Sequence, residues 1–238
     1  MSTSGSTNYS ETEAGIIRDA YIGIGAIDPT DSGVEAEQYE YASRVLNRLI
    51  KSWQKRGYNL WRTEEGSVTL VAAQAAYTMG GAGSPNFAAR PVRISEVRYR
   101  SSSSIDLPMT EIAREDYFQL PNKASTGTPT NWYYDPSRSQ GTLYVWPVPT
   151  TTTANTLRFT YQRAFEDFDE NSDEPDLPQE WYDAIVKSLG AELCPGIFPT
   201  EPGLTQLHSQ RASEAVETAL MFDRETAPLR FMHDGAGY

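Results

Sequence analysis

Acidic side chains crowd residues 166–176, and no lysine or arginine interrupts them. Asp167, Asp169 and Asn171 occupy the first, third and fifth positions of a calcium-binding loop. However, Ser172 stands where that loop needs glycine, and Pro178 stands where it needs a bidentate glutamate. We therefore interpret this stretch as a solvated acidic loop, with a subunit contact or a cation site as the alternatives. Its acids are Glu166, Asp167, Asp169, Glu170, Asp173, Glu174 and Asp176.

The remaining reactive residue types are sparse. A single cysteine excludes an internal disulfide framework, and with two histidines it cannot complete a four-ligand Cys/His zinc site. Cys194 precedes Pro195 at a predicted helix end, and its only candidate bases are His208 and His233. A buried structural thiol is the better interpretation. No phosphate-binding glycine loop or G-x-S-x-G motif is present, so we expect no catalytic residue, no metal and no cofactor.

Basic residues gather at two places. Arg44, Arg48, Lys51 and Lys55 follow spacings of four, three and four, which puts them on one face of a helix. This basic stripe is either a solvated face or a docking face for an acidic partner, which a second copy of the chain could supply. Arg98 and Arg100 flank Tyr99 on a predicted strand, a pattern that can bind single-stranded nucleic acid. The net charge of −12 and a pI near 4.6 disfavour that role.

Helical patterns lie toward both ends of the chain. Ser10 with Glu13, and Ser32 with Glu35, have the form of capping boxes that open helices. Behind the second, the apolar positions Ala42, Val45, Leu46, Leu49, Ile50 and Trp53 form one buried stripe, and Gly57 suits the helix end. Helix returns at Pro178 and ends at Pro195. A last helix covers roughly 204–224, with Leu207, Ala215, Ala219 and Phe222 expected inward.

Between these helices the sequence has strand character. Short runs rich in Val, Ile, Thr, Tyr and Trp alternate with turn residues, and residues 135–141 read as a turn between two aromatic strands. Residues 111–120 are a possible short helix. The chain is therefore predicted to be α+β, a helical bundle built from both ends with an inserted antiparallel β domain. The expected strands are Ser67–Ala72, Pro91–Arg100, Thr130–Asp135, Thr142–Trp146 and Asn155–Gln162.

The predicted domains follow from these patterns. Residues 1–9 form a flexible arm without a secretory signal, 10–62 and 177–226 form the helical body, 63–176 form the β domain with the acidic loop, and 227–238 form a C-terminal extension. The extension carries Leu229, Phe231, Met232 and Tyr238 without helical period, which predicts that a partner buries them, with a frayed end of no consequence as the alternative. No stretch approaches the roughly 20 apolar residues of a membrane span, so no membrane contact is expected.

Three segments resemble the head-to-tail adaptors of short-tailed phages and their relatives, also known as tail accessory factors or tail tube proteins of type A. The first is the helix at 42–53 with its Trp53, followed by Gly57 and Trp61. The second is Trp132–Asp135 with Gly141–Pro149 and Leu157–Tyr161. The third is the acidic-to-helical passage Asp173–Ile185. Together they cover roughly residues 35–198, and their order and spacing carry the resemblance.

The resemblance implies a structural virion protein rather than an enzyme. It implies a ring of subunits, commonly twelve, at the head-tail junction, with the portal protein above and a nozzle or tail tube below. Double-stranded DNA would pass through without sequence recognition, and assembly would take place in the host cytoplasm. The alternatives are another tail-completion or nozzle ring protein, and a virion-associated cell-wall hydrolase using an acidic pair such as Glu111 and Glu115.

Overall fold

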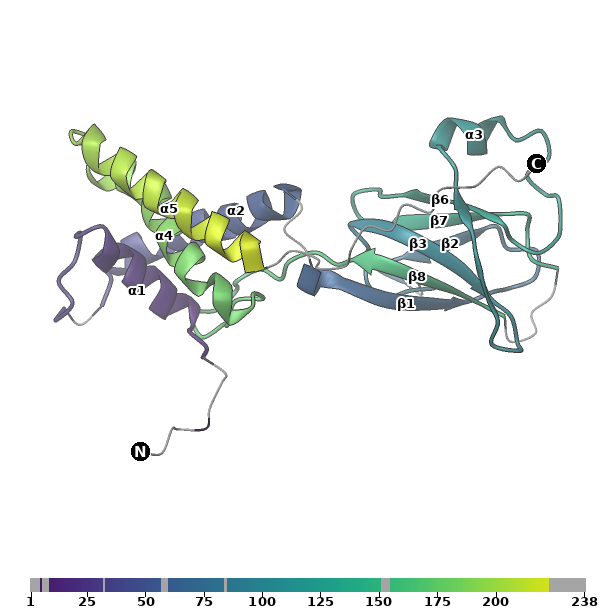
Figure 1. Cartoon of the computed structure of the whole chain (residues 1–238), viewed down its shortest axis with the longest axis horizontal. Coiled ribbons are helices and arrows are strands. Elements are labelled where there is room, and N and C mark those ends of the chain that lie inside the picture. Colours follow the sequence, from purple (N-terminus) through teal and green to yellow (C-terminus); the bar gives the residue numbers. More distant parts are fainter. Residues whose placement is uncertain are drawn as a thin grey trace, which may run out of the picture. The chain divides into compact units, whose positions relative to one another are not determined.

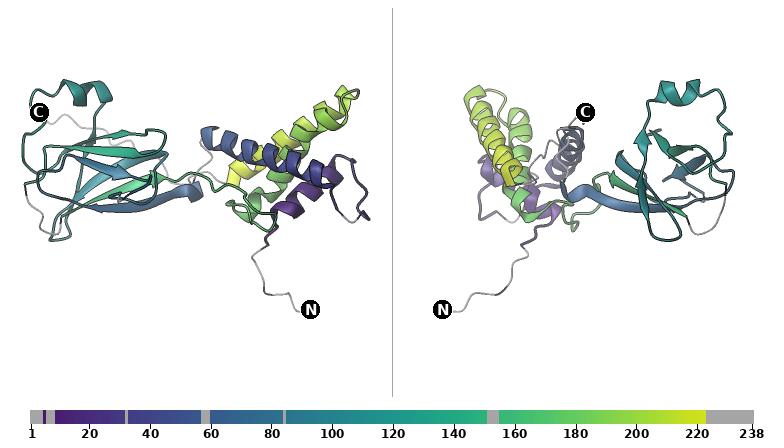
Figure 2. Two further views of the ribbon diagram at one scale, coloured as in Figure 1. Left: turned by 180° about the vertical axis from the view of Figure 1, so that it is seen from behind. Right: turned by 45° about the vertical axis from the view of Figure 1, so that its right-hand side comes forward.

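The computed structural model describes residues 5, 9–31, 33–56, 60–83, 85–150 and 155–222. The chain divides into two compact units, a helical unit that ends at Leu60 and resumes at Glu166, and a β unit from Trp61 to Phe165. Figures 1 and 2 show helices in the first unit, and strands together with a short helical segment in the second. The predicted α+β class is confirmed. The acidic loop, which we expected within the β domain, lies in the helical unit.

Helix α4 organises the helical unit, because it packs against all three other long helices. Its buried side includes Ile185, Leu189 and Leu193. At Gly190 a β-carbon would come within 3.1 Å of Cγ2 of Ile24, so glycine permits the close approach of α1 and α4. The helices are α1 (Glu13–Gly23), α2 (Ala36–Arg56), α4 (Tyr182–Ile197) and α5 (Pro202–Phe222), with a 3-10 turn, η2 (Gln179–Trp181), before α4.

Helix α2 has the amphipathic form that the sequence predicts. Val45, Leu46, Leu49 and Ile50 are all buried along one side. Trp53 completes this stripe, and its ring centroid lies 5.4 Å from that of Trp181 in η2. Burial of aliphatic and aromatic side chains of this size is worth about 1.5–3 kcal/mol each, which fixes α2 against α4.

Three predicted helix details are wrong. The N-cap of α1 is Thr12, not Ser10: Thr12 has extended backbone, and its Oγ1 accepts a hydrogen bond from the amide of Gly15 at 3.3 Å. Helix α4 continues past Pro195 to Ile197, since a proline in the last turn removes only one intrahelical bond. Leu207 and Phe222 in α5 are exposed, by 41% and 70%. The buried stripe of α5 consists of Ala212, Ala215, Val216 and Ala219.

The β unit consists of two four-stranded sheets. In sheet A the order is β1-β8-β3-β4, and in sheet B it is β2-β7-β6-β5. All pairs are antiparallel except β5 with β6. The strands are β1 (Thr63–Thr69), β2 (Ala76–Met79), β3 (Arg93–Arg100), β4 (Asp106–Pro108), β5 (Thr110–Glu111), β6 (Asn131–Asp135), β7 (Gly141–Trp146) and β8 (Thr156–Gln162). A short 3-10 turn, η1 (Leu60–Arg62), precedes β1, and α3 (Arg114–Gln119) follows β5.

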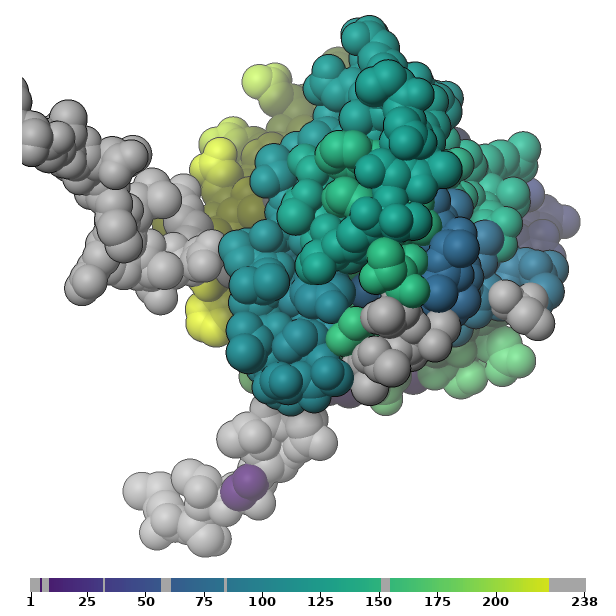
Figure 3. All heavy atoms as spheres, turned by 90° about the vertical axis from the view of Figure 1, so that its right-hand side faces the viewer, coloured from purple at the N-terminus to yellow at the C-terminus, as the bar shows by residue number. Residues whose placement is uncertain are grey.

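Residues of both sheets share one hydrophobic core, so the sheets pack face to face. Val97 and Phe159 contribute from sheet A, and Tyr77, Trp132 and Leu143 from sheet B. Alternate residues along β7 and β8 are buried, as a strand with one face on a core requires. Helix α3 stands out from this sandwich, as the ribbon of Figure 1 and the teal segment at the top of Figure 3 show.

Sequence patterns located five strands and missed three. The turn at 135–141 joins β6 to β7, as predicted. The first strand begins at Thr63 rather than Ser67, because tertiary contacts hold its acidic start: Glu64 accepts hydrogen bonds from Tyr161 and Arg163, both at 2.8 Å. Strands β2, β4 and β5 have four residues or fewer, too short for a recognisable period.

Candidate interaction surfaces

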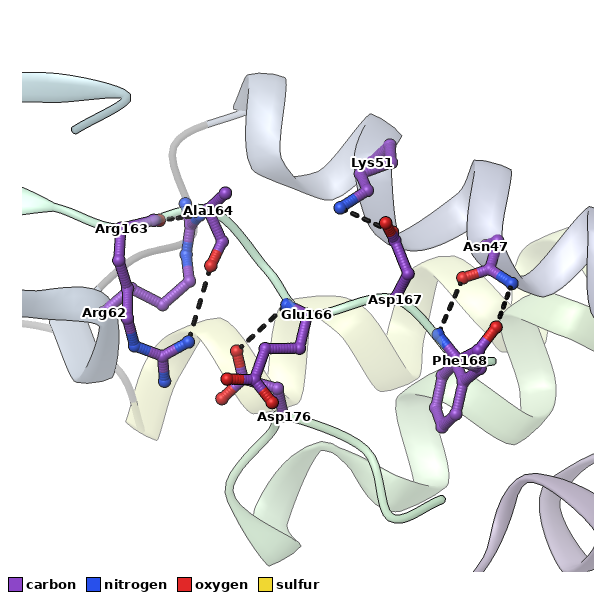
Figure 4. Close-up of polar contacts among 9 residues, drawn as sticks. All are labelled: Asn47, Lys51, Arg62, Arg163, Ala164, Glu166, Asp167, Phe168 and Asp176. Carbon is purple, nitrogen blue, oxygen red and sulfur yellow. Dashed lines mark hydrogen bonds and ion pairs between the residues drawn. The ribbon is translucent and has the colours of Figure 1, made fainter. Parts of the chain in front are cut away.

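The basic stripe lies on α2, away from the buried stripe. Arg44, Arg48 and Lys55 are exposed, and no carboxylate of the described residues forms an ion pair with them. Lys51 differs, since its Nζ lies 2.6 Å from Oδ1 of Asp167 in the acidic segment of the same chain (Figure 4). The structure therefore divides the predicted stripe into three cations open to a partner and one held within the subunit.

The acidic segment, residues 166–176, is attached to α2 by Asn47. Its side-chain amide donates to the carbonyl of Phe168 and accepts from the Phe168 amide, both at 3.0 Å (Figure 4). Phe168 is only 6% exposed, so a buried ring and two backbone bonds fix the segment beside Lys51. The sequence did not predict the role of Asn47, because nothing in a sequence indicates that an asparagine on a helix surface will bind a distant backbone group.

The acidic segment also caps α1. The carbonyl of Asp173 accepts from the amide of Glu13 at 2.8 Å, and that of Asn171 accepts from Ala14 at 3.1 Å. These amides belong to the first turn of α1, which has no intrahelical acceptors for them. The segment thus connects α1 with α2, a structural role that the sequence did not suggest.

The side chains of the acidic segment form contacts that differ from those of a calcium-binding loop. Oδ2 of Asp173 accepts from the amides of Asp169 and Glu170, at 2.9 and 2.8 Å. These bonds hold the pKa of Asp173 below its usual value. Asp167 is bound to Lys51. Within the described residues, no group of three or more His, Cys, Asp or Glu side chains is placed to hold a metal ion.

Carboxylates of the segment remain exposed to solvent. Asp169, Glu170 and Glu174 are exposed, and none of them forms an ion pair with a cation of the described chain. Asp169 and Glu174 help to line a shallow, acid-lined hollow of about 550 Å³, to which Phe168 contributes. The hollow offers negative charge to a partner.

The arginines of β3 are engaged in ion pairs. Arg98 binds Glu65 of β1. Arg100 donates two hydrogen bonds to Asp106 of β4, at 2.6 and 2.5 Å, and these bonds lower the pKa of the Asp106 carboxyl. Arg158 of β8 stands beside them without an ion-pair partner among the described residues, and sequence reasoning missed it.

The candidate nucleophile and the candidate acidic pair have settings unlike an active site. Cys194 is fully buried, with Sγ 3.8 Å from Oγ1 of Thr205, which confirms the predicted buried thiol. Burial lowers the pKa of His208, and the charge of Arg211 lowers it further. His233 lies outside the described residues.

Glu111 on β5 and Glu115 in α3 are both exposed, whereas a general acid needs an apolar pocket.

The predicted tail contacts, Leu229, Phe231, Met232 and Tyr238, lie outside the described residues. So do Ser32 and Gly57, the expected cap and end of α2. Among the described helices, none is long and apolar enough to cross a membrane.

A protein-family model matches most of the chain. The model of the SU10 adaptor protein family matches residues 16–231. No curated protein matches the sequence. Among solved structures, a chain from the neck of an empty GTA particle is similar at 11% identity and a TM-score of 0.28, over 78% of this chain and 83% of that chain. At this TM-score the similarity is too weak to indicate a shared fold or function.

Proposed function

The chain belongs to the SU10 adaptor protein family, and we propose that it forms a ring that docks beneath the portal of a tailed-phage virion. The family is one of phage head-to-tail adaptors, so the protein is a structural adaptor of the virion. In the proposed role the ring extends the DNA channel, retains the packaged genome, and carries the nozzle or tail tube.

The observation that carries this proposal is the extent of the family match. Residues 16–231 include most of α1 and, among the described residues, all of α2, α4, α5 and the strands of both sheets. Both compact units therefore belong to the adaptor itself. The match supports a role for the whole chain rather than for one unit attached to another function.

The net charge supports a ring through which DNA passes without being bound. With a net charge of −12, the subunit as a whole repels phosphates, which suits a channel through which a duplex slides without sticking. The basic stripe is then better used on protein, where Arg44, Arg48 and Lys55 can meet carboxylates of the portal or of a neighbouring subunit. We further propose twelve copies and assembly in the host cytoplasm, for a particle whose tail is either short or long.

The test is direct imaging of the purified protein mixed with the portal of the same particle. We expect the free protein to be a monomer or loose oligomer, and negative staining to show closed rings stacked on portals. Stable rings of the isolated protein at low concentration would contradict assembly on the portal. Rings that bind only preassembled nozzles or tail tubes, and never portals, would identify a different tail-completion ring.

A further inference from the structure

The outer face of sheet A presents a group of three arginines, which we call the arginine face: Arg98, Arg100 and Arg158. Arg158 lies in β8, and its direct cross-strand neighbours are Arg98 in β3 and Ser67 in β1. Arg100 lies two residues further along β3, on the same face. Like charges directly opposite one another destabilise a strand pair. The Arg98–Arg158 pair thus opposes folding, and sheet packing does not explain it.

Carboxylates of the same face compensate only two of these cations. Glu65 binds Arg98, and Asp106 binds Arg100. Glu96, the remaining acid on this side of β3, forms no ion pair with Arg158, and neither does any other described residue. The arginine face therefore keeps one guanidinium, that of Arg158, without an ion pair among the described residues, and the nearby charge of Asp106 is shared with Arg100.

The setting of Arg158 favours a fixed acceptor rather than a freely solvated side chain. The residue is partly buried, and its Nε is enclosed without a hydrogen-bond acceptor in the described chain, as is Nε of Arg98. The Nε end of the guanidinium is thus shielded from solvent. A planar, pre-oriented guanidinium loses little entropy when it binds a carboxylate, which suits it to an interface.

The same chain offers the complementary charge on its other unit. Asp169, Glu170 and Glu174 of the acidic segment are exposed and without a cation, while the backbone around them is fixed by Asn47 and Asp173. A ring of identical subunits needs two different surfaces that fit each other, because each copy contacts the next in a head-to-tail manner. An arginine face on the β unit and an acidic segment on the helical unit meet that requirement.

We propose that the arginine face, through Arg158, binds the acidic segment of a second copy of this chain. The proposal rests on the proposed function, since it supplies a subunit contact of that ring. The overall negative charge of the chain favours protein carboxylates over DNA phosphates as the partner. Charge-assisted bonds of this kind fix the register of an interface and disfavour wrong partners.

The experiment exchanges charges between the two surfaces. One variant carries Arg158→Glu, and a second carries Glu170→Lys with Glu174→Lys. Each variant alone should lower ring occupancy on portals roughly tenfold or more, because like charges then face each other at every contact. An equimolar mixture should recover rings, since alternating subunits again pair opposite charges. Arg138→Glu, an exposed arginine in the β6–β7 turn, is the control and should assemble as the wild type does.

The outcomes are distinct. If the wild type forms no rings on portals, the proposed function fails. If the wild type and each of the two variants, tested separately, form rings equally well, the contact proposed here does not exist. If both variants fail and the mixture also fails, the two surfaces do not meet between copies, and the inference is overturned. Loss of DNA retention in intact Arg158→Glu rings would instead identify phosphate as the partner. Circular dichroism before mixing establishes that each variant is folded.

Discussion

The hydroxyl of Tyr39 in α2 donates a hydrogen bond of 2.6 Å to Oε2 of Glu13 in α1. Glu13 is only 2% exposed, so this bond joins two helices through a buried carboxylate. The carboxylate also lies in the first turn of α1, where the helix dipole favours negative charge. Burial, together with the bond to Glu13, raises the pKa of Tyr39.

We predict that Tyr39→Phe lowers the free energy of unfolding by about 1–3 kcal/mol, because the substitution removes the donor from a buried carboxylate. Urea unfolding followed by circular dichroism measures the change. Tyr41→Phe is the matched control, since Tyr41 stands two residues away on the same helix and is 41% exposed. Equal losses in the two variants would show that the Tyr39–Glu13 bond has no special weight.

Two tyrosines of the β unit predict how its stability depends on alkaline pH. Burial raises the pKa of Tyr134 to about 12 and that of Tyr161 to about 12, and the Tyr161 bond to Glu64 adds to the second shift. Below pH 10 both residues are protonated in the folded and unfolded chains, so the full stability is present. Above pH 10 the unfolded chain ionises first, and stability falls until the folded pKa is reached.

The measurement is the free energy of unfolding from pH 8 to roughly pH 11, a range that includes the ordinary tyrosine pKa of 10.0 at which the unfolded chain ionises. We expect a decline above pH 10 in the wild type and a shallower decline in Tyr134→Phe and in Tyr161→Phe. If both variants retain the wild-type slope, other groups govern the alkaline transition.

The basic stripe predicts a salt-sensitive contact. Reversal of Arg44 and Arg48 to Glu should weaken assembly on portals roughly tenfold, since an exposed ion pair contributes about 0.2–1 kcal/mol and the new charges add repulsion. Assembly of the variant should also respond less to salt, which screens exposed charges beyond about 8–10 Å. Sedimentation with portals over a salt series measures both effects.

Two controls separate the stripe from general charge. Arg211→Glu reverses the charge of one exposed arginine in α5 and should leave assembly intact. Lys51→Glu should instead loosen the acidic segment, because Lys51 binds Asp167 within the subunit. Unchanged assembly and salt response after reversal of Arg44 and Arg48 would make the stripe a solvated face.

The C-terminal extension predicts an anchor. Deletion of residues 227–238 should leave the subunit folded and abolish portal binding, because Leu229, Phe231 and Met232 are apolar side chains best buried by a partner. Each such burial is worth about 1.5–3 kcal/mol before ordering costs. Thermal unfolding tests whether the truncated subunit is folded, and a portal pull-down tests whether it still binds. Undiminished portal occupancy by the truncated chain would assign the anchor to the helices of the helical unit instead.

The sequence by itself determined the features that repeat within a short window. The buried stripe of α2, from Ala42 to Trp53, follows the helical period, and the aromatic strands β6 and β7 follow the strand period with turn residues between them. The α+β class follows from these local patterns. The boundaries of the elements do not follow from these patterns, as Thr12 in place of Ser10 shows, because neighbouring residues compete for the same cap.

Only the tertiary structure decided which distant residues meet. The pairing of Asn47 with Phe168, the burial of Arg62 over the ring of Phe165, and the alignment of Arg158 with Arg98 join residues far apart in the chain. Such neighbours depend on strand register and on loop placement, which are set by the packing of the whole core. A single sequence shows the type and period of its residues, whereas the contacts that give a charge its use arise when the core closes around it.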